Sequence, residues 1–243
     1  MTVIGEFCED IFVYGDCKKL SPEAPVPVFT PVKITTNSGM AGNVVENAKV
    51  LSPNIEIMGI YQNKKITKTR YVDNKSNHMF IRIDEGEEDI DKFVLDDENL
   101  NFIINSDIVI VSDYNKGFLN HDDIAKIGCL SRLSILDSKK ILNLDIVKSF
   151  SFVKMNESEF KQNTEVKGHN NIITTLGSKG CMFEDEIFES PSPKETIDVS
   201  GAGDTFTTSF ILKYFETKNK KESIIFANKM ASIVVSKRGV TTP

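Results

Sequence analysis

The chain has 243 residues, of which 40% are hydrophobic and 26% are charged, the balance of a globular protein large enough to bury a core without disulfides. Its 35 acidic and 29 basic residues give a net charge of −6, which argues against nucleic acid as the main partner. No run approaches the roughly 18 apolar residues of a membrane helix, and the four cysteines form no C-x-x-C pair, so we expect free thiols in a reducing cytosol.

Short apolar runs alternate with segments of helical periodicity along the chain. In chain order we expect a strand at Thr2–Gly5, a helix at Gly42–Leu51, a strand at Ile55–Ile60, a helix at Asp89–Asn105, a strand at Asp107–Ser112, a helix at His121–Arg132, strands at Leu133–Asp137, Phe152–Met155, Asn171–Leu176 and Cys181–Glu184, and helices at Asp204–Glu216 and Lys221–Lys237. Several strands are nearly continuous in apolar residues, as strands covered on both faces are. The alternation predicts an α/β fold with a mostly parallel sheet and helices on both faces.

Two regions interrupt this alternation. Ile11–Thr36 contains four prolines and shows no helical pattern, and Lys65–Asp84 has the pattern of two successive strands. We expect these regions to form a small β-sheet beside the main one. Such a sheet, placed over the carboxyl ends of the parallel strands, would close on a ligand.

Open α/β sheets bind ligands where their strands end, so the segments that follow the strands are candidates for function. Gly177–Gly180 either leaves backbone N–H groups free for a ligand or is a plain hairpin turn. Asn156–Glu159 either caps a helix with a capping box or organises Mg²⁺ and its waters. Asp113–Gly117 puts a lysine and a carboxylate at a strand end, with a simple turn as the alternative. Ser138–Lys140 has the alternative of a solvated charge run.

The segment Ile197–Phe210 carries two glycines and an aspartate where an apolar run passes into a helix. If the helix begins near Gly201, the N–H groups of Gly201, Ala202 and Gly203 point out of its amino end, where partial positive charge suits a phosphate. The same field keeps Asp204 ionised, so that it accepts a proton from a hydroxyl held against the phosphate. Glycines also mark ordinary turns, but beside the other strand-end groups this segment indicates phosphoryl transfer.

Five motifs of the chain resemble those of one enzyme family. The string "DVSGAGDTF" at Asp198–Phe206 resembles the second signature of the ribokinase-like (PfkB) carbohydrate kinases, which is highly specific. "TLGSKG" at Thr175–Gly180 resembles the nucleotide-binding turn of that family, and "NESE" at Asn156–Glu159 is similar to its N-x-x-E motif. "FAN" at Phe226–Asn228 and "VSKRGVTTP" at Val235–Pro243 resemble its closing segment beside the adenine.

A closer resemblance lies inside this family. "LSPEAPVPVF" at Leu20–Phe29, "KITKTRYV" at Lys65–Val72 and "SDYNKG" at Ser112–Gly117 resemble the kinase domain of the bacterial heptose-7-phosphate kinase/ADP-heptose synthase proteins. The resemblance runs from about Val3 to the last residue. The S-P-E-A-P-V-P string carries most of the weight for the substrate, since it is not a general kinase feature.

The resemblance implies a ribokinase-like three-layer α/β/α sandwich, a single domain over residues 1–243 with lid strands drawn from about 11–36 and 65–84. It implies a cytoplasmic homodimer that uses ATP, Mg²⁺ and a monovalent cation to phosphorylate the anomeric hydroxyl of a heptose 7-phosphate. The product is the 1,7-bisphosphate used in making ADP-heptose for surface polysaccharide. We expect the sugar phosphate and ATP as partners, and neither nucleic acid nor a membrane.

The resemblance also implies roles for individual residues. By the family pattern Asp204 is the catalytic base, and the anion hole is formed by Gly201, Ala202 and Gly203. Sugar contacts are implied for Asp10 and Asn43, and the candidates for holding the sugar's phosphate are Lys68, Arg70 and Lys116. The residues implied around the nucleotide are Thr175, Gly177, Ser178, Gly180 and Asn228. Asn156 and Glu159 are expected to act on Mg²⁺ indirectly, through water.

The chain departs from the family pattern in three places. Gly5-Glu6 stands where the family usually has Gly-Asp, Met40 stands where it usually has glycine, and the segment between Gly59 and Lys65 lacks a helix and a strand that relatives carry. No nucleotidyltransferase pattern follows, so we expect the kinase step alone. The departures leave two alternatives: a kinase for another sugar or sugar phosphate, and a nucleotide- or sugar-binding homologue without turnover.

Overall fold

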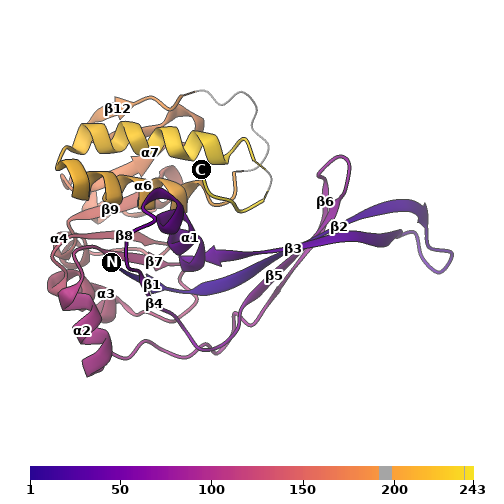
Figure 1. Ribbon diagram of the computed structural model, residues 1–243, viewed down its shortest axis with the longest axis horizontal. Coiled ribbons are helices and arrows are strands. Elements are labelled where there is room, and N and C mark those ends of the chain that lie inside the picture. Colours follow the sequence, from indigo (N-terminus) through magenta and orange to yellow (C-terminus); the bar gives the residue numbers. More distant parts are fainter. Residues whose placement is uncertain (192–198, 238) are drawn as a thin grey trace.

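The computed structural model describes residues 1–191, 199–237 and 239–243, and two β-sheets organise this part of the chain (Figure 1). The main sheet has eight strands in the order β12-β11-β10-β9-β8-β7-β1-β4. Its strands are β1 (Thr2–Gly5), β4 (Met58–Ile60), β7 (Val109–Asp113), β8 (Ser134–Ser138), β9 (Phe152–Asn156), β10 (Ile172–Thr175), β11 (Cys181–Phe183) and β12 (Glu186–Phe188). The pairs from β4 to β10 are parallel, and β11 and β12 are antiparallel at one edge, so the sheet is mostly parallel as predicted.

Helices cover both faces of this sheet and give the predicted three layers (Figure 1). They are α1 (Ala41–Leu51), α2 (Asp97–Asn105), α3 (His121–Leu130), α4 (Leu144–Ser149), α5 (Glu157–Gln162), α6 (Ala202–Thr217) and α7 (Lys220–Val234), with 3-10 turns η1 (Thr164–Val166) and η2 (Gly177–Lys179). One apolar cluster packs α2, α3 and α4 against the sheet. A second cluster packs α1, α6 and α7 against the opposite face.

The continuous apolar run Ile108–Val111 explains why both faces are covered. Successive side chains of a strand point to opposite faces, so Val111 packs in the first cluster and Ile110 in the second. The helix expected at Asp204–Glu216 packs on the second of these faces. The ring of Phe152 on β9 lies 4.8 Å from that of Phe210 on α6.

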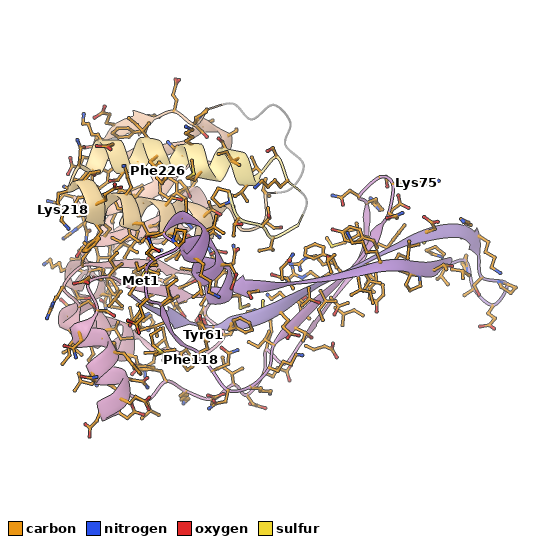
Figure 2. All side chains as sticks on the ribbon, viewed as in Figure 1. Met1, Tyr61, Lys75, Phe118, Lys218 and Phe226 are labelled. Atoms are coloured by element: carbon orange, nitrogen blue, oxygen red, sulfur yellow. The ribbon has the colours of Figure 1, made fainter. Side chains whose placement is uncertain are left out.

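The second sheet has the strand order β3-β2-β5-β6 and extends away from the body (Figure 1). Its strands are β2 (Phe7–Leu20), β3 (Pro27–Met40), β5 (Thr67–Asp73) and β6 (Met79–Glu85). Figure 2 shows Lys75, in the turn between β5 and β6, projecting away from the body. Pro31 is tolerated because β3 is an edge strand. The two regions that interrupted the α/β alternation therefore form the small separate sheet that was predicted.

Met40 joins the second sheet to the body, since it ends β3 and immediately precedes α1. Its backbone has φ 54° and ψ −131°, a conformation that glycine adopts freely and a residue with a side chain does not. The side chain is buried in the apolar core, and this packing offsets the backbone strain. Met40, which stands in place of the usual glycine, is therefore strained in its backbone and well packed in its side chain.

The helix expected over Asp89–Asn105 is wrong at its start. The side chain of Asp96 accepts the N–H of Asn99 at 2.8 Å, and α2 begins after this N-cap. Residues 86–96 form neither helix nor strand, although Ile90 and Phe93 are buried. The apolar spacing in this segment reflects the packing of irregular chain rather than helical turns.

Smaller differences concern element ends. β4 begins at Met58 rather than Ile55, and α7 ends at Val234 rather than Lys237. The six-residue helix α4 was not predicted, because one and a half turns are too short to show periodicity. None of the helices in the described part of the chain combines the length and apolar character needed to cross a membrane.

Candidate active site

A cavity of about 740 Å³ opens where β8, β9 and β10 end and α6 begins. This volume is within the range of roughly 300–1,000 Å³ that is usual for small-molecule sites. Its lining comes from the strand ends, the start of α6 and one side of α7: Tyr114, Asp137, Lys139, Lys154, Asn156, Glu157, Ser158, Thr175, Leu176, Gly177, Ser178, Gly180, Ser190, Val199, Gly201, Ala202, Gly203, Asp204, Phe206, Asn228, Ala231, Ser232 and Val235. The cavity lies at the edge of the sheet where ligands were expected.

Asp204 is a buried acid of this cavity, with 5% of its surface exposed. One carboxylate oxygen accepts a hydrogen bond from the Asn43 amide at 2.8 Å, and the other accepts from the Tyr114 hydroxyl at 2.9 Å. Burial raises the pKa of the Asp204 carboxyl to about 6, although the Asn43 and Tyr114 hydrogen bonds lower it. The group is therefore mostly ionised at neutral pH and close enough to its pKa to take up a proton.

The orientation of the Asn43 amide is fixed by a chain of hydrogen bonds. The Thr205 hydroxyl donates to Asn47 Oδ1 at 2.8 Å, and Asn47 Nδ2 donates to Asn43 Oδ1 at 3.1 Å and to the Asn43 carbonyl at 2.8 Å. Because its oxygen is engaged in this way, Asn43 turns its N–H₂ group toward Asp204. Asn43 was predicted as a site residue, whereas Asn47, which lies one helical turn later, was not.

The start of α6 lies directly beside Asp204. Gly201 is its N-cap in the left-handed region, with φ 79°, and a Cβ there would lie 2.7 Å from Asn43 Nδ2. The Ala202 N–H donates to the Val199 carbonyl at a long 3.3 Å. Gly201, Ala202 and Gly203 all line the cavity, at the positive end of a 16-residue helix. Asp198, the first residue of the signature, and Arg238, in the closing segment, lie outside the described residues.

A buried ion pair next to Gly203 was missed. Lys154 on β9 lies 2.8 Å from Asp137 on β8, and both side chains line the cavity. Burial by itself would raise the pKa of Asp137, but the charges of Lys154 and Lys139 hold it below its usual value. A lysine inside the apolar run Phe152–Met155 was the available signal, since a charged residue in a strand covered on both faces is unusual.

The residues expected around the nucleotide come together on one side of the cavity. Thr175, Gly177, Ser178, Gly180 and Asn228 all line it. The segment from 177 to 180 is also the turn between antiparallel β10 and β11. It is therefore both a hairpin turn and part of the cavity lining. The Asn228 side-chain N–H₂ donates to the Phe188 carbonyl at 2.9 Å, which ties α7 to β12.

The capping-box alternative for Asn156–Glu159 is observed. The Asn156 side chain accepts the Glu159 N–H at 2.9 Å, and the Glu159 carboxylate accepts the Asn156 N–H at 2.7 Å and a hydrogen bond from Lys139. Asn156 lines the cavity, whereas both Glu159 oxygens are engaged within the protein. Asp137 has a buried carboxylate oxygen without a hydrogen-bond partner in the described chain. This oxygen, which lies 3.9 Å from Lys139 Nζ, suits a hard cation such as Mg²⁺. No group of three or more Asp, Glu, His or Cys side chains that could hold a metal ion occurs among the described residues.

The residues expected to hold the sugar's phosphate are each paired with a carboxylate. Arg70 forms an ion pair with Asp10, and Lys68 lies 2.9 Å from Glu87, which also accepts a hydrogen bond from Lys116. Asp10, Lys68 and Arg70 come from the second sheet, and Lys116 follows β7. The structure thus gathers the two lysines around Glu87, a residue that the sequence analysis did not single out.

Glu6 explains how the turn after β7 is held. It is fully buried, and its carboxylate accepts the N–H groups of Tyr114 at 2.8 Å, Lys116 at 3.0 Å and Phe118 at 3.3 Å. Burial raises the pKa of Glu6, and these three hydrogen bonds oppose that shift. Glu6 therefore holds the turn from which the Tyr114 hydroxyl reaches Asp204.

The chain is similar in sequence to known proteins. Residues 145–243 match the family model described as pfkB family carbohydrate kinase. Two proteins named "Bifunctional protein HldE" are similar to this chain. The one from Helicobacter pylori is 30% identical over an alignment that covers 98% of the chain, and the one from Nitratiruptor is 28% identical over 99% of it. The chain spans 63% and 62% of the length of these two relatives.

Solved structures show the same fold. Arabidopsis thaliana ribokinase complexed with ribose and ATP aligns with a TM-score of 0.68 at 16% identity, over 98% of this chain and 93% of that one. Escherichia coli phosphofructokinase-2 in complex with potassium aligns with a TM-score of 0.69 at 14% identity, over 99% and 94%. The fold and cavity thus define a ribokinase-like α/β protein. The expected resemblance to pfkB family carbohydrate kinases is borne out over residues 145–243.

Proposed function

We propose that this chain transfers the γ-phosphoryl group of ATP to the anomeric hydroxyl of a heptose 7-phosphate, giving the 1,7-bisphosphate used in making ADP-heptose. The observation that carries the kinase step is Asp204, a buried carboxylate at the start of α6 that faces the cavity and has a pKa near 6. The resemblance to heptose-7-phosphate kinases and the HldE relatives support the choice of sugar.

In the proposed mechanism the chain positions the reactants and stabilises charge. ATP lies along Thr175–Gly180 and Asn228, with its γ-phosphoryl group at Gly201–Gly203. The sugar hydroxyl attacks phosphorus while its proton passes to Asp204, and ADP leaves with the electrons of the broken P–O bond. Tyr114 and Asn43 hold the carboxylate in place through their hydrogen bonds.

Mg²⁺ is the cofactor that we propose, with a monovalent cation as a second one. Mg²⁺ neutralises charge on the ATP phosphates when bound. Asp137, through the oxygen that accepts no hydrogen bond, and Asn156 would hold it, with Glu159 acting indirectly through water and through its cap on Asn156. A cytoplasmic location is part of the proposal, and the four cysteines, which are free thiols, support it.

We further propose a homodimer that forms through the second sheet. A cross-strand row on one face of this sheet runs Ile34–Val13–Tyr71–Ile81, and Ile34 and Ile81 at its ends are 63% and 54% exposed. The S-P-E-A-P-V-P string lies in and around the turn between β2 and β3, at the far end of the sheet from the body (Figure 1). This place favours a contact between chains over direct sugar binding in the same chain.

The assignment of Asp204 is tested by Asp204→Asn. We expect ADP formation with heptose 7-phosphate and ATP to fall by about 10²–10⁴-fold, because the amide cannot accept the hydroxyl proton. A coupled assay of ADP release measures this loss, and turnover near the wild-type rate would refute the role of Asp204 as base.

Another sugar or sugar phosphate is the second candidate, and the pairing of Lys68 and Lys116 with Glu87 favours it, because this carboxylate already engages both lysines. A panel of sugars with product NMR separates the candidates. Failure of heptose 7-phosphate while another sugar reacts would reject the first proposal. ATP binding by calorimetry without ADP formation from any sugar would indicate a binding protein instead.

A further inference from the structure

Lys154 occupies the corner of the cavity where α6 begins. Its ammonium lies 2.8 Å from Asp137 Oδ2, and its side chain is 4% exposed. A Cβ at Gly203 would lie 3.0 Å from Lys154 Nζ, so the ammonium sits against the first turn of α6. Asp204 follows in the chain and lines the same cavity. A cation, a helix amino end and the buried carboxylate therefore meet at one point.

A purely structural ion pair explains this arrangement poorly. The neighbours of Lys154 on β9, Val153 and Met155, are buried and apolar, and a buried ion pair is often no more stabilising than apolar residues of similar size. An ammonium has three N–H donors, and among the described residues only Asp137 accepts one from Lys154. Two donors remain for an anion in the cavity.

On the basis of the proposed function, we infer that Lys154 is a catalytic residue that contacts the transferring phosphoryl group, and that Asp137 is the residue that positions its ammonium. Negative charge spreads over the equatorial oxygens of the phosphoryl group in the transition state. A fixed cation at this point stabilises that charge at little reorganisation cost. The helix start supplies partial charges, whereas Lys154 supplies a full one.

Nucleotide binding should depend on Lys154 even in the absence of turnover. ATP carries the γ-phosphoryl group that Lys154 contacts, and ADP lacks it. Removing the ammonium should therefore weaken ATP-like ligands selectively. A charge-assisted hydrogen bond of this kind corresponds to roughly a 10- to 100-fold change in affinity.

The experiment measures the affinities of the full chain for ADP and for the β,γ-imido analogue of ATP, with Mg²⁺, by calorimetry. The variants are Lys154→Met, which keeps the length of the side chain, and Lys154→Gln, which keeps a donor for Asp137 if the first variant folds poorly. The matched control is Lys140→Met, because Lys140 forms an equally buried 2.8 Å pair with Asp113 but does not line the cavity. Thermal unfolding confirms that each protein is folded.

We expect the Lys154 variants to bind the imido analogue at least 10-fold more weakly and ADP within about 2-fold of wild type, with kcat falling about 10²-fold or more. Lys140→Met should leave the ratio of the two affinities unchanged. Equal effects on both nucleotides, no effect on either, or the same selective loss in Lys140→Met would overturn the inference and leave the kinase proposal standing. A wild-type chain that binds neither nucleotide would overturn both.

Discussion

The protonation of Asp204 links the structure of the cavity to its chemistry. Its carboxylate accepts hydrogen bonds from Asn43 and Tyr114, which lower its pKa. Burial raises the pKa by more, so that the net value is about 6. Burial and the charge of Asp204 hold the pKa of the Tyr114 hydroxyl well above its usual value, so Tyr114 stays a donor over the working range of pH. A base must be ionised in the free enzyme, so we expect kcat/KM to fall as the pH drops through about 6.

Tyr114→Phe tests this assignment. The change removes a hydrogen bond that lowers the pKa of Asp204, so the acidic limb of the kcat/KM profile should move to higher pH, and activity at pH 6 should fall more than activity at pH 8. Tyr61→Phe is the control, since Tyr61 packs on Phe7 and does not line the cavity. An acidic limb that stays in place or moves to lower pH in Tyr114→Phe would contradict the role of this hydroxyl.

At the scale of elements, α6 depends on the backbone of its N-cap. Gly201 has φ 79° and Gly168 has φ 82°, so both adopt the left-handed conformation that disfavours a side chain. Their surroundings differ. A Cβ at Gly201 would lie 2.7 Å from Asn43 Nδ2, whereas a Cβ at Gly168 would meet nothing within 4 Å among the described residues.

This contrast predicts different outcomes for two alanine substitutions. Gly201→Ala and Gly168→Ala should each cost roughly 1–2 kcal/mol of stability through backbone strain. Only Gly201→Ala should also lower kcat, by about 10-fold or more, because it displaces the Asn43 amide from Asp204. Denaturant unfolding and ADP release measure the two effects. Equal activity in the two variants would show that the Gly201–Asn43 contact does not matter for catalysis.

The elements also show why only part of the site could be predicted from the sequence. The strand ends and the start of α6 are local patterns, so Asn156, Gly177 and Asp204 were found. The Asp137–Lys154 pair joins neighbouring strands, and its formation depends on the order of strands in the sheet. Apolar periodicity does not contain that order. Glu87 was missed for a related reason, since it lies just before the helix expected at Asp89–Asn105 and its partners Lys68 and Lys116 are distant in the sequence.

At the scale of the whole molecule, the second sheet is the least covered part of the fold. It extends from the body (Figure 1), and every residue of β6 is exposed. A long edge strand with exposed apolar residues is prone to pair with another chain. The second sheet has two faces. On one of them Phe12 packs with Val72 and with Val240, which is near the carboxyl end. The row that ends in Ile34 and Ile81 lies on the opposite face.

The proposed dimer is tested by placing a charge in this row. Ile81→Asp should reduce the mass measured by light scattering from that of two chains to that of one, because an interface does not bury an unpaired carboxylate without a large cost. Ile225→Asp on α7 is the control, since Ile225 is exposed to a similar degree, 61%, but lies on the body. A wild-type chain that is monomeric at the highest concentrations used in the assay would reject the dimer. An Ile81→Asp protein that stays dimeric would place the interface elsewhere.

If the string at the tip of the β2–β3 arm acts between chains, the monomeric variant should also bind the sugar phosphate more weakly while its ADP affinity stays the same.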